Sequence, residues 1–264
     1  MSMSFILTGS TSNFTTCFNS VRLDPNKKYE AALLSLDTYN SIPNIKEGKN
    51  NVFKYYNGEV WKTIELSTGS YELTSINDEI KRQIIANGDS ESALDITANV
   101  STLRSIVTIN DPNYSVDFGV PNSIGSVLGF ETVADRCGGI DPVLSHGYNV
   151  SPNIVDIIHV NSILVNIDII MGSYVNGSAS PTIYSFYPNV APGYKIVERP
   201  NPSLIYYPVS RDDISSMRVW LTDQKGNSVD FIGETITIRI HVREVKSRSI
   251  ESDIMKAILD LNKK

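Results

Sequence analysis

The sequence alternates hydrophobic and polar residues with a period of two along much of its length, most clearly near its C-terminal end. Residues 234–245 read ETITIRIHVREV, which places Ile236, Ile238, Ile240 and Val242 on one parity and polar residues on the other. Side chains of a β-strand alternate between the two faces of a sheet, so four aliphatic residues in register predict one wall of a hydrophobic core. The segment is therefore predicted to be a half-buried strand with a polar outer face.

Strand-like segments of this kind recur through the chain, separated by turn residues such as Asn57-Gly58 and Asn176-Gly177. Asn-Gly supplies the positive φ angles that tight hairpin turns require. We expect strands near residues 29–42, 52–56, 60–66, 94–99, 102–109, 113–118, 160–170, 183–188, 194–198, 204–209, 216–222 and 229–245. Because these strands do not alternate with helices, the pattern excludes a parallel α/β sheet and favours an all-β fold, a single jelly-roll β-sandwich.

Two segments have a helical period instead. In residues 75–86, Ile76, Ile80 and Ile84 recur every four positions, and Asn87-Gly88 ends the pattern. In residues 249–264, four aliphatic residues form one stripe and lysines close the segment, which suits the dipole of an amphipathic helix. We therefore predict one inserted helix and one C-terminal helix.

These patterns predict three parts along the chain. Residues 1–24 are rich in Ser, Thr and Asn with spaced phenylalanines, which is typical of an extended arm that packs aromatic residues against a larger body. Residues 25–248 are expected to form the single jelly-roll domain, and residues 249–264 the C-terminal amphipathic helix. Within the domain, residues 131–156 carry several Gly and Pro residues and are predicted to form a long surface loop.

Composition places the chain of 264 residues among globular proteins, with 41% hydrophobic and 20% charged residues. A net charge of −6 argues against a protein whose main role is to neutralise nucleic acid, so any such contact would be local. Cys17 and Cys137 stand far apart, which supports neither a disulfide scaffold nor a zinc site. The sequence shows no basic leader before an apolar segment and no run of eighteen apolar residues, so we expect neither a signal peptide nor a membrane span.

The search for chemistry yields no catalytic, cofactor or metal residues. His146, His159 and His241 have no metal-ligand spacing from one another or from a Cys. The sequence has no nucleophile elbow, Walker loop or dinucleotide-binding glycine pattern. The pair Asp212-Asp213 is more readily explained as part of a turn than as calcium ligands or glycosidase carboxylates. We therefore expect no enzyme and no cofactor.

Five residues are candidates for contacts between subunits. Arg239, His241 and Arg243 share the outer face of the last strand, which favours either a solvated surface or an electrostatic contact with a neighbour. Phe5 and Phe14 lie in the predicted arm, where aromatic side chains would anchor it to a larger body. Tyrosines near strand ends, such as Tyr206, fit an interface as well as a core edge.

Six segments in order along the chain carry a more specific signal. They are LLSLDTYNSIPNI (residues 33–45), YSVDF (114–118), NSIGSVLGF (122–130), GSYVNG (172–177), PGYKI (192–196) and DQKGNSVDFIGE (223–234). Together they resemble the penton, or minor capsid, proteins of Polinton/Maverick-type elements and of their adintovirus and virophage relatives. The resemblance extends from about residue 30 to residue 243 and thus covers nearly the whole chain.

This resemblance implies a structural capsid protein that forms homopentamers at the vertices of an icosahedral virion, assembled inside the host cell. The partner would be a separate major capsid protein with a double jelly roll. The helix at residues 75–86 and the loop at residues 131–156 would be insertions between jelly-roll strands. The family supplies no catalytic residues. Two other hypotheses stay open: a monomeric lectin-like or carbohydrate-binding jelly-roll module, and a sandwich-fold glycosidase or lyase with paired carboxylates.

Overall fold

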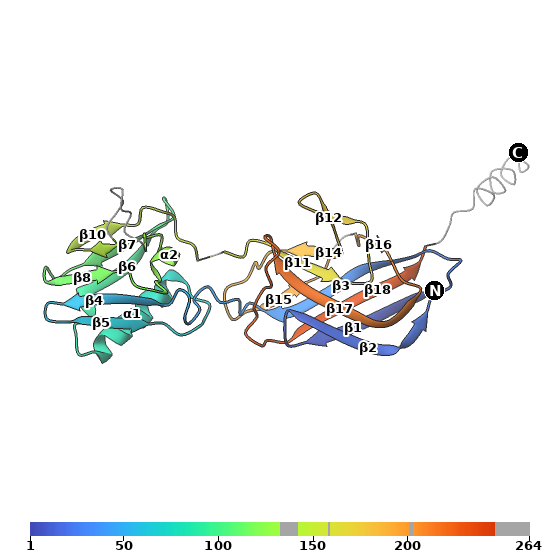
Figure 1. The fold of residues 1–264 in the computed structure, drawn as a ribbon, viewed down its shortest axis with the longest axis horizontal. Helices are drawn as coiled ribbons and strands as arrows, with labels where there is room; N and C mark the ends of the chain where they lie inside the picture. The colour runs from blue at the N-terminus through green and yellow to red at the C-terminus, as the bar shows by residue number, and fades with distance from the viewer. Residues whose placement is uncertain (133–141, 158, 201–202, 246–264) are drawn as a thin grey trace, which may run out of the picture.

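A computed structural model describes residues 1–132, 142–157, 159–200 and 203–245. These residues are mostly β, and every ladder between the named strands is antiparallel. Figure 1 shows two bodies joined by two extended connections. The predicted C-terminal helix at residues 249–264 lies outside the described residues.

The larger body is a sandwich of two sheets. The first sheet has the order β1 (Ser2–Gly9), β18 (Ile236–Glu244), β3 (Tyr29–Tyr39), β15 (Lys195–Glu198), and the short β16 (Tyr207–Pro208) also pairs with β3. The second sheet has the order β14 (Thr182–Phe186), β11 (Ile163–Ile167), β17 (Asp213–Asp223), β2 (Asn13–Arg22). A hairpin of β12 (Ser173–Val175) and β13 (Ser178–Ser180) connects β11 to β14.

The strand order identifies this sandwich as a jelly roll. Leaving aside the two-residue β16 and the β12–β13 hairpin, the described residues supply eight sandwich strands: β1, β2, β3, β11, β14, β15, β17 and β18. Numbered in that sequence, one sheet has the order 1-8-3-6 and the other 5-4-7-2. The first and last strands are therefore neighbours, as are the second and seventh, which is the nested Greek-key order of a jelly roll.

The predicted alternation of the last strand is confirmed. Ile236, Ile238, Ile240 and Val242 have no exposed surface and lie in the core between the two sheets. The neighbouring strand β3 of the same sheet pairs with β18 through a register shift between Arg239 and Ile240. A β-bulge of this kind changes which residues face inward, so that both Leu33 and Leu36 of β3 reach the core despite their odd spacing.

The N-terminal arm predicted at residues 1–24 is wrong. Residues 2–9 form β1, which pairs with β18, and residues 13–22 form β2, which pairs with β17. The physical reason is that the Ser and Thr residues occupy alternate outward positions, while Phe5 and Leu7 extend into the sandwich core. A composition rich in Ser, Thr and Asn concealed a strand pair that completes both sheets.

The smaller body is inserted between β3 and β11 and has a hydrophobic core of its own, formed by residues between Ile45 and Leu144. One of its sheets has the order β5 (Trp61–Glu65), β4 (Val52–Asn57), β8 (Tyr114–Asp117), β9 (Val143–Leu144). The other has the order β10 (Gly147–Val150), β7 (Arg104–Ile109), β6 (Leu94–Asn99). Helix α1 (Leu73–Ala86), the short helix α2 (Gly125–Leu128) and a 3₁₀ turn (Glu91–Ala93) complete it.

The inserted body confirms one prediction and changes another. Helix α1 occurs where a helix was predicted, with Ile76, Ile80 and Ile84 buried. The predicted domain of residues 25–248, however, contains two hydrophobic cores among its described residues. The insertion includes the strands expected near residues 94–118, and β9 and β10 lie within the stretch predicted as a loop at residues 131–156. Alternation identifies strands but not the sheet to which each belongs.

Candidate assembly interface

The outer face of β18 presents the three basic residues that the sequence singled out. Arg239, His241 and Arg243 alternate with the buried residues of the strand. On one side they lie opposite residues of β1, where Ile6 pairs with Arg239 and Ser4 with His241. The exposed edge of the sandwich is thus close to this basic row, because β1 pairs with no other strand among the described residues.

Two of the three basic residues are engaged within the chain. The Nε2 atom of His241 lies 2.7 Å from the Ser2 hydroxyl, and its Nδ1 atom lies 2.8 Å from the Tyr206 hydroxyl. Arg243 donates from Nε to a carboxylate oxygen of Glu30 at 2.6 Å, and its guanidinium lies 3.5 Å from the centre of the Tyr206 ring. The hydrogen bond with His241 and the cation–π contact with Arg243 therefore hold Tyr206 over the outer face, and the ion pair with Glu30 fixes Arg243 beneath it.

Arg239 differs from its two neighbours. Its side chain is exposed, and within the described parts of the chain it makes no hydrogen bond or ion pair. Its five N–H donors are therefore available to a carboxylate or carbonyl outside the described residues. Of the predicted basic contacts, Arg239 has the greatest capacity to bind a partner.

The two predicted phenylalanine contacts close the gap between β1 and β2. Phe5 is 9% exposed and contacts the ring of Phe18 edge-on, with centroids 5.3 Å apart. Phe14 is half-buried, and its ring occupies the space that a side chain at Gly9 would need. Phe5 therefore has little surface left for a partner, whereas Phe14 has a partly open ring.

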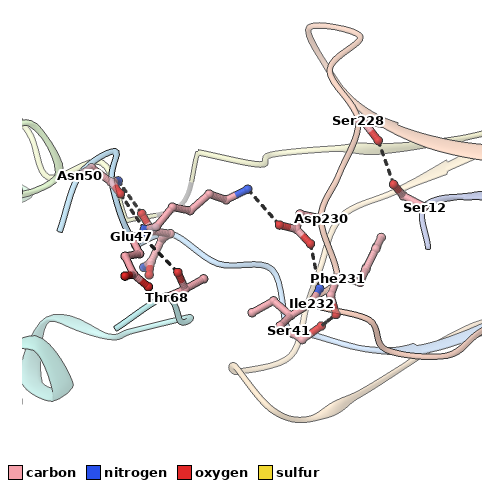
Figure 2. Close-up of polar contacts among 11 residues, drawn as sticks. Ser12, Ser41, Glu47, Asn50, Thr68, Ser228, Asp230, Phe231 and Ile232 are labelled. Atoms are coloured by element: carbon pink, nitrogen blue, oxygen red, sulfur yellow. Dashed lines mark hydrogen bonds and ion pairs between the residues drawn. The ribbon is translucent and has the colours of Figure 1, made fainter. Parts of the chain in front are cut away.

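Polar contacts join the two bodies where the chain leaves β3, as Figure 2 shows. Lys46 lies 3.3 Å from a carboxylate oxygen of Asp230, and the Ser41 hydroxyl donates to the carbonyl of Phe231 at 2.5 Å. The other Asp230 oxygen accepts the backbone N–H of Ile232 at 2.9 Å. This N–H, and secondarily Lys46, holds the pKa of Asp230 below its usual range. These contacts connect the segment that leaves β3, which contains Ser41 and Lys46, to the loop between β17 and β18.

A second polar cluster fixes the end of α1 inside the inserted body. Asp89 accepts hydrogen bonds from the Tyr55 hydroxyl at 2.7 Å, from Lys62 at 2.8 Å and from Asn57 at 3.1 Å. Burial alone would raise the pKa of Asp89, but these three donors outweigh it and hold the pKa low. Burial and the neighbouring carboxylate raise the pKa of Tyr55. The cluster is fully paired, which favours a structural role.

The described residues include no cluster of metal-ligating side chains. Across residues 1–132, 142–157, 159–200 and 203–245, no group of three His, Cys, Asp or Glu side chains lies close enough to hold a metal ion. His159 lines a hollow between the two bodies with Ile42, Tyr71 and Val190. The polar atoms of Asn44 at that hollow are already bonded to the backbone of Tyr71. Nor is any described helix long and apolar enough to cross a membrane.

Comparison with known proteins finds likenesses among solved structures. No family model matches the chain, and no curated protein matches it. The crystal structure of the selenomethionine-labelled mavirus penton protein is similar in fold at 10% sequence identity, with a TM-score of 0.48. The match covers 93% of this chain and 100% of that protein.

Proposed function

We propose that the protein is a structural capsid protein: a penton, or minor capsid, protomer that forms pentamers at icosahedral vertices. The observation that carries the proposal is the jelly-roll strand order of the larger body, found in a chain whose segments resemble the penton proteins of Polinton/Maverick-type elements. A fold alone does not define a function. The proposal therefore depends on assembly, which can be measured directly.

The positions of the resembling segments agree with a role in shape rather than chemistry. Residues 33–45 include the end of β3 and the link to the inserted body, and residues 223–234 connect β17 to β18. Residues 172–177 and 192–196 form the first half of the β12–β13 hairpin and the start of β15. Residues 33–39 form most of β3, and the other parts of these four segments are links, turns or strand ends of the sandwich. The remaining two segments, residues 114–118 and 122–130, include β8 and α2 of the inserted body.

In this proposal the partners are further copies of the chain and a separate double-jelly-roll major capsid protein, and the location is the virion. The inserted body would extend from the sandwich as a second, independently packed unit. Arg239 would meet a carboxylate or carbonyl of a neighbouring subunit. The acidic net charge of the chain gives no support for extensive contact with the genome.

Sedimentation of the purified protein over a range of concentrations tests the proposal. Five copies of the 29.2 kDa chain have a mass of about 146 kDa. A species of that mass, in equilibrium with or in place of the monomer, would support a pentamer. A protein that stays at 29.2 kDa at every concentration would contradict it and favour a monomeric carbohydrate-binding module.

A further inference from the structure

The two longest stretches of the sequence without a charged residue are residues 1–21 and 169–194. Because 20% of the residues in the chain are charged, stretches of these lengths would be expected to hold about four and about five charges. In the structure, both stretches include edge strands of the sandwich. The first forms β1 and most of β2, and the second forms β12, β13 and β14.

These strands lie on opposite sides of the sandwich. β1 and β2 are the edge strands on one side, which we call flank one, and the Phe5–Phe18 contact joins them. β14 and β15 are the edge strands on the other side, which we call flank two, where the Tyr184 hydroxyl donates to Glu198 at 3.2 Å. Figure 1 shows β1 and β2 along the lower side of the sandwich and β14 on the upper side.

Both flanks expose large apolar side chains. On flank one, Ile6 is 56% exposed, and Met3, Phe14, Phe18 and Val21 are only partly buried. On flank two, Tyr174 and Tyr187 are largely exposed, and Ile205 is 66% exposed beside a hollow. The hollow is lined by Leu33, Ile183, Tyr184, Pro200, Ser203 and Ile205.

Edge strands with this composition are rarely left open. Proteins usually protect an exposed edge with lysine, proline or an inward charge, because unpaired backbone groups otherwise bind other chains. β1 has none of these, β2 reaches its first charge at Arg22, and β14 has none. Among the described residues, β1 pairs only with β18, β2 only with β17 and β14 only with β11. The flanks have the features of surfaces that are covered in the working state of the protein.

The size of a flank suits a specific contact. The ten residues of β2 span about 33 Å at a rise of about 3.3 Å each, and two sheets about 10 Å apart with side chains beyond them give a width of about 20 Å. A contact of that size would bury about 600 Å² on each copy, or about 1,200 Å² in total. That total is at the lower end of the range for specific protein interfaces.

We propose that flank one of each copy packs against flank two of the next copy. Both surfaces are largely apolar, and the two charges that β15 brings to flank two already have partners within the chain, Lys195 with Asp37 and Glu198 with Tyr184, so the contact need not bury an unpaired charge. Because the flanks are different surfaces on opposite sides of one body, the contact is heterologous, and repeating it produces a ring when the rotation closes. This proposal rests on the proposed function, since it assigns the surfaces through which the pentamer would form.

The test introduces one charge on flank one. Ile6→Lys places an ammonium group at an exposed position of β1, and we expect the five-chain species to be lost. Ile85→Lys is the matched control, since Ile85 is 53% exposed on α1 of the inserted body, away from both flanks. Near-ultraviolet circular dichroism and thermal melts establish that both variants are folded. A ring that survives Ile6→Lys, or that Ile85→Lys breaks equally, would overturn the assignment.

Mixing two blocked variants tests the pairing of unlike flanks. Ile205→Lys blocks flank two, so an equimolar mixture with Ile6→Lys contains one intact pair of flanks. We expect each variant alone to be a monomer and the mixture to form dimers of about 58 kDa, twice the mass of the chain, with no rings. A mixture that stays monomeric, or dimers formed by either variant alone, would refute the proposal. If the wild type itself is monomeric, the proposed function fails instead, and the flank assignment falls with it.

Discussion

The two hydrophobic cores predict that the protein unfolds in two separable steps, and a pair of matched substitutions can assign each step to a core. Ile80 lies on α1 in the inserted body, and Ile238 lies on β18 in the sandwich; neither side chain is exposed. Ile→Val removes one buried methylene at either position, which costs about 1 kcal/mol of unfolding free energy.

The size of each unit converts this cost into a shift of its unfolding midpoint. The inserted body contains about 110 residues between Ile45 and Ile157, so about 1 kcal/mol lowers its midpoint by about 4 °C. The larger sandwich loses about 3 °C for the same cost. Because the side chains belong to different cores, Ile80→Val should move only one transition and Ile238→Val only the other.

Differential scanning calorimetry of the wild type, the two single variants and the double variant measures both midpoints. We expect two transitions, each lowered by one substitution, with additive shifts in the double variant because the sites do not touch. A single transition that both substitutions lower equally would refute the reasoning, since the two bodies would then form one cooperative unit.

Three further predictions follow from individual contacts. Asp89→Asn should destabilise the inserted body by about 2–3 kcal/mol, because three donors lose a charged acceptor. Because the pKa of Asp89 is lowered in the fold, its contribution to stability is present above the unfolded pKa of about 4 and is lost as pH falls through the folded pKa. Calorimetry of the wild type should therefore show an unfolding midpoint that drops steeply below about pH 4. The midpoint of Asp89→Asn should drop less steeply. Lys46→Met should change the unfolding free energy by less than about 1 kcal/mol in chemical denaturation, because the pair with Asp230 is substantially exposed, and a larger loss would mean that this pair holds the two bodies together. Arg239→Glu should leave the melting midpoint within about 2 °C of the wild type but slow pentamer assembly in low salt, measured by light scattering, and unchanged assembly kinetics would remove Arg239 from the interface.

The sequence was most reliable for elements in which the spacing of the hydrophobic residues coincides with the buried face. In β18, four aliphatic residues alternate with polar ones, and all four are in the core. In α1, the four-residue spacing of Ile76, Ile80 and Ile84 matches the helix face that is buried in the core of the inserted body. In both elements, local periodicity and tertiary burial agree, so the pattern alone was sufficient.

Composition was a poorer guide than periodicity at the N-terminus. Residues 1–24 have the Ser, Thr and Asn content of an arm. In β2 the inward positions, which include Phe14, Thr16 and Phe18, are only half-buried, so the alternation of hydrophobic and polar residues is weak there. The assignment of strands to two cores could not be made from alternation, since it depends on long-range pairing. The charge-free stretches were the available signal for the flanks, and they identify surfaces only once strand order shows where those strands lie.

The candidate site was predicted in part. The basic row on β18 was visible from parity, but the sequence could not show that Tyr206, from a distant segment, binds both His241 and Arg243. That contact depends on how residues 203–208 return to the sheet beside β3. Among the described residues, the interaction divides the row into two engaged side chains and one, Arg239, without a polar partner, a distinction that spacing cannot reveal.

Electron microscopy of the purified protein tests the central claim most directly, because it shows the assembly itself. Two-dimensional averages of particles at micromolar concentration should show a ring of five identical subunits, with a mass of about 146 kDa by mass photometry of the same sample. Particles of 29.2 kDa with no ring at any concentration would contradict the account.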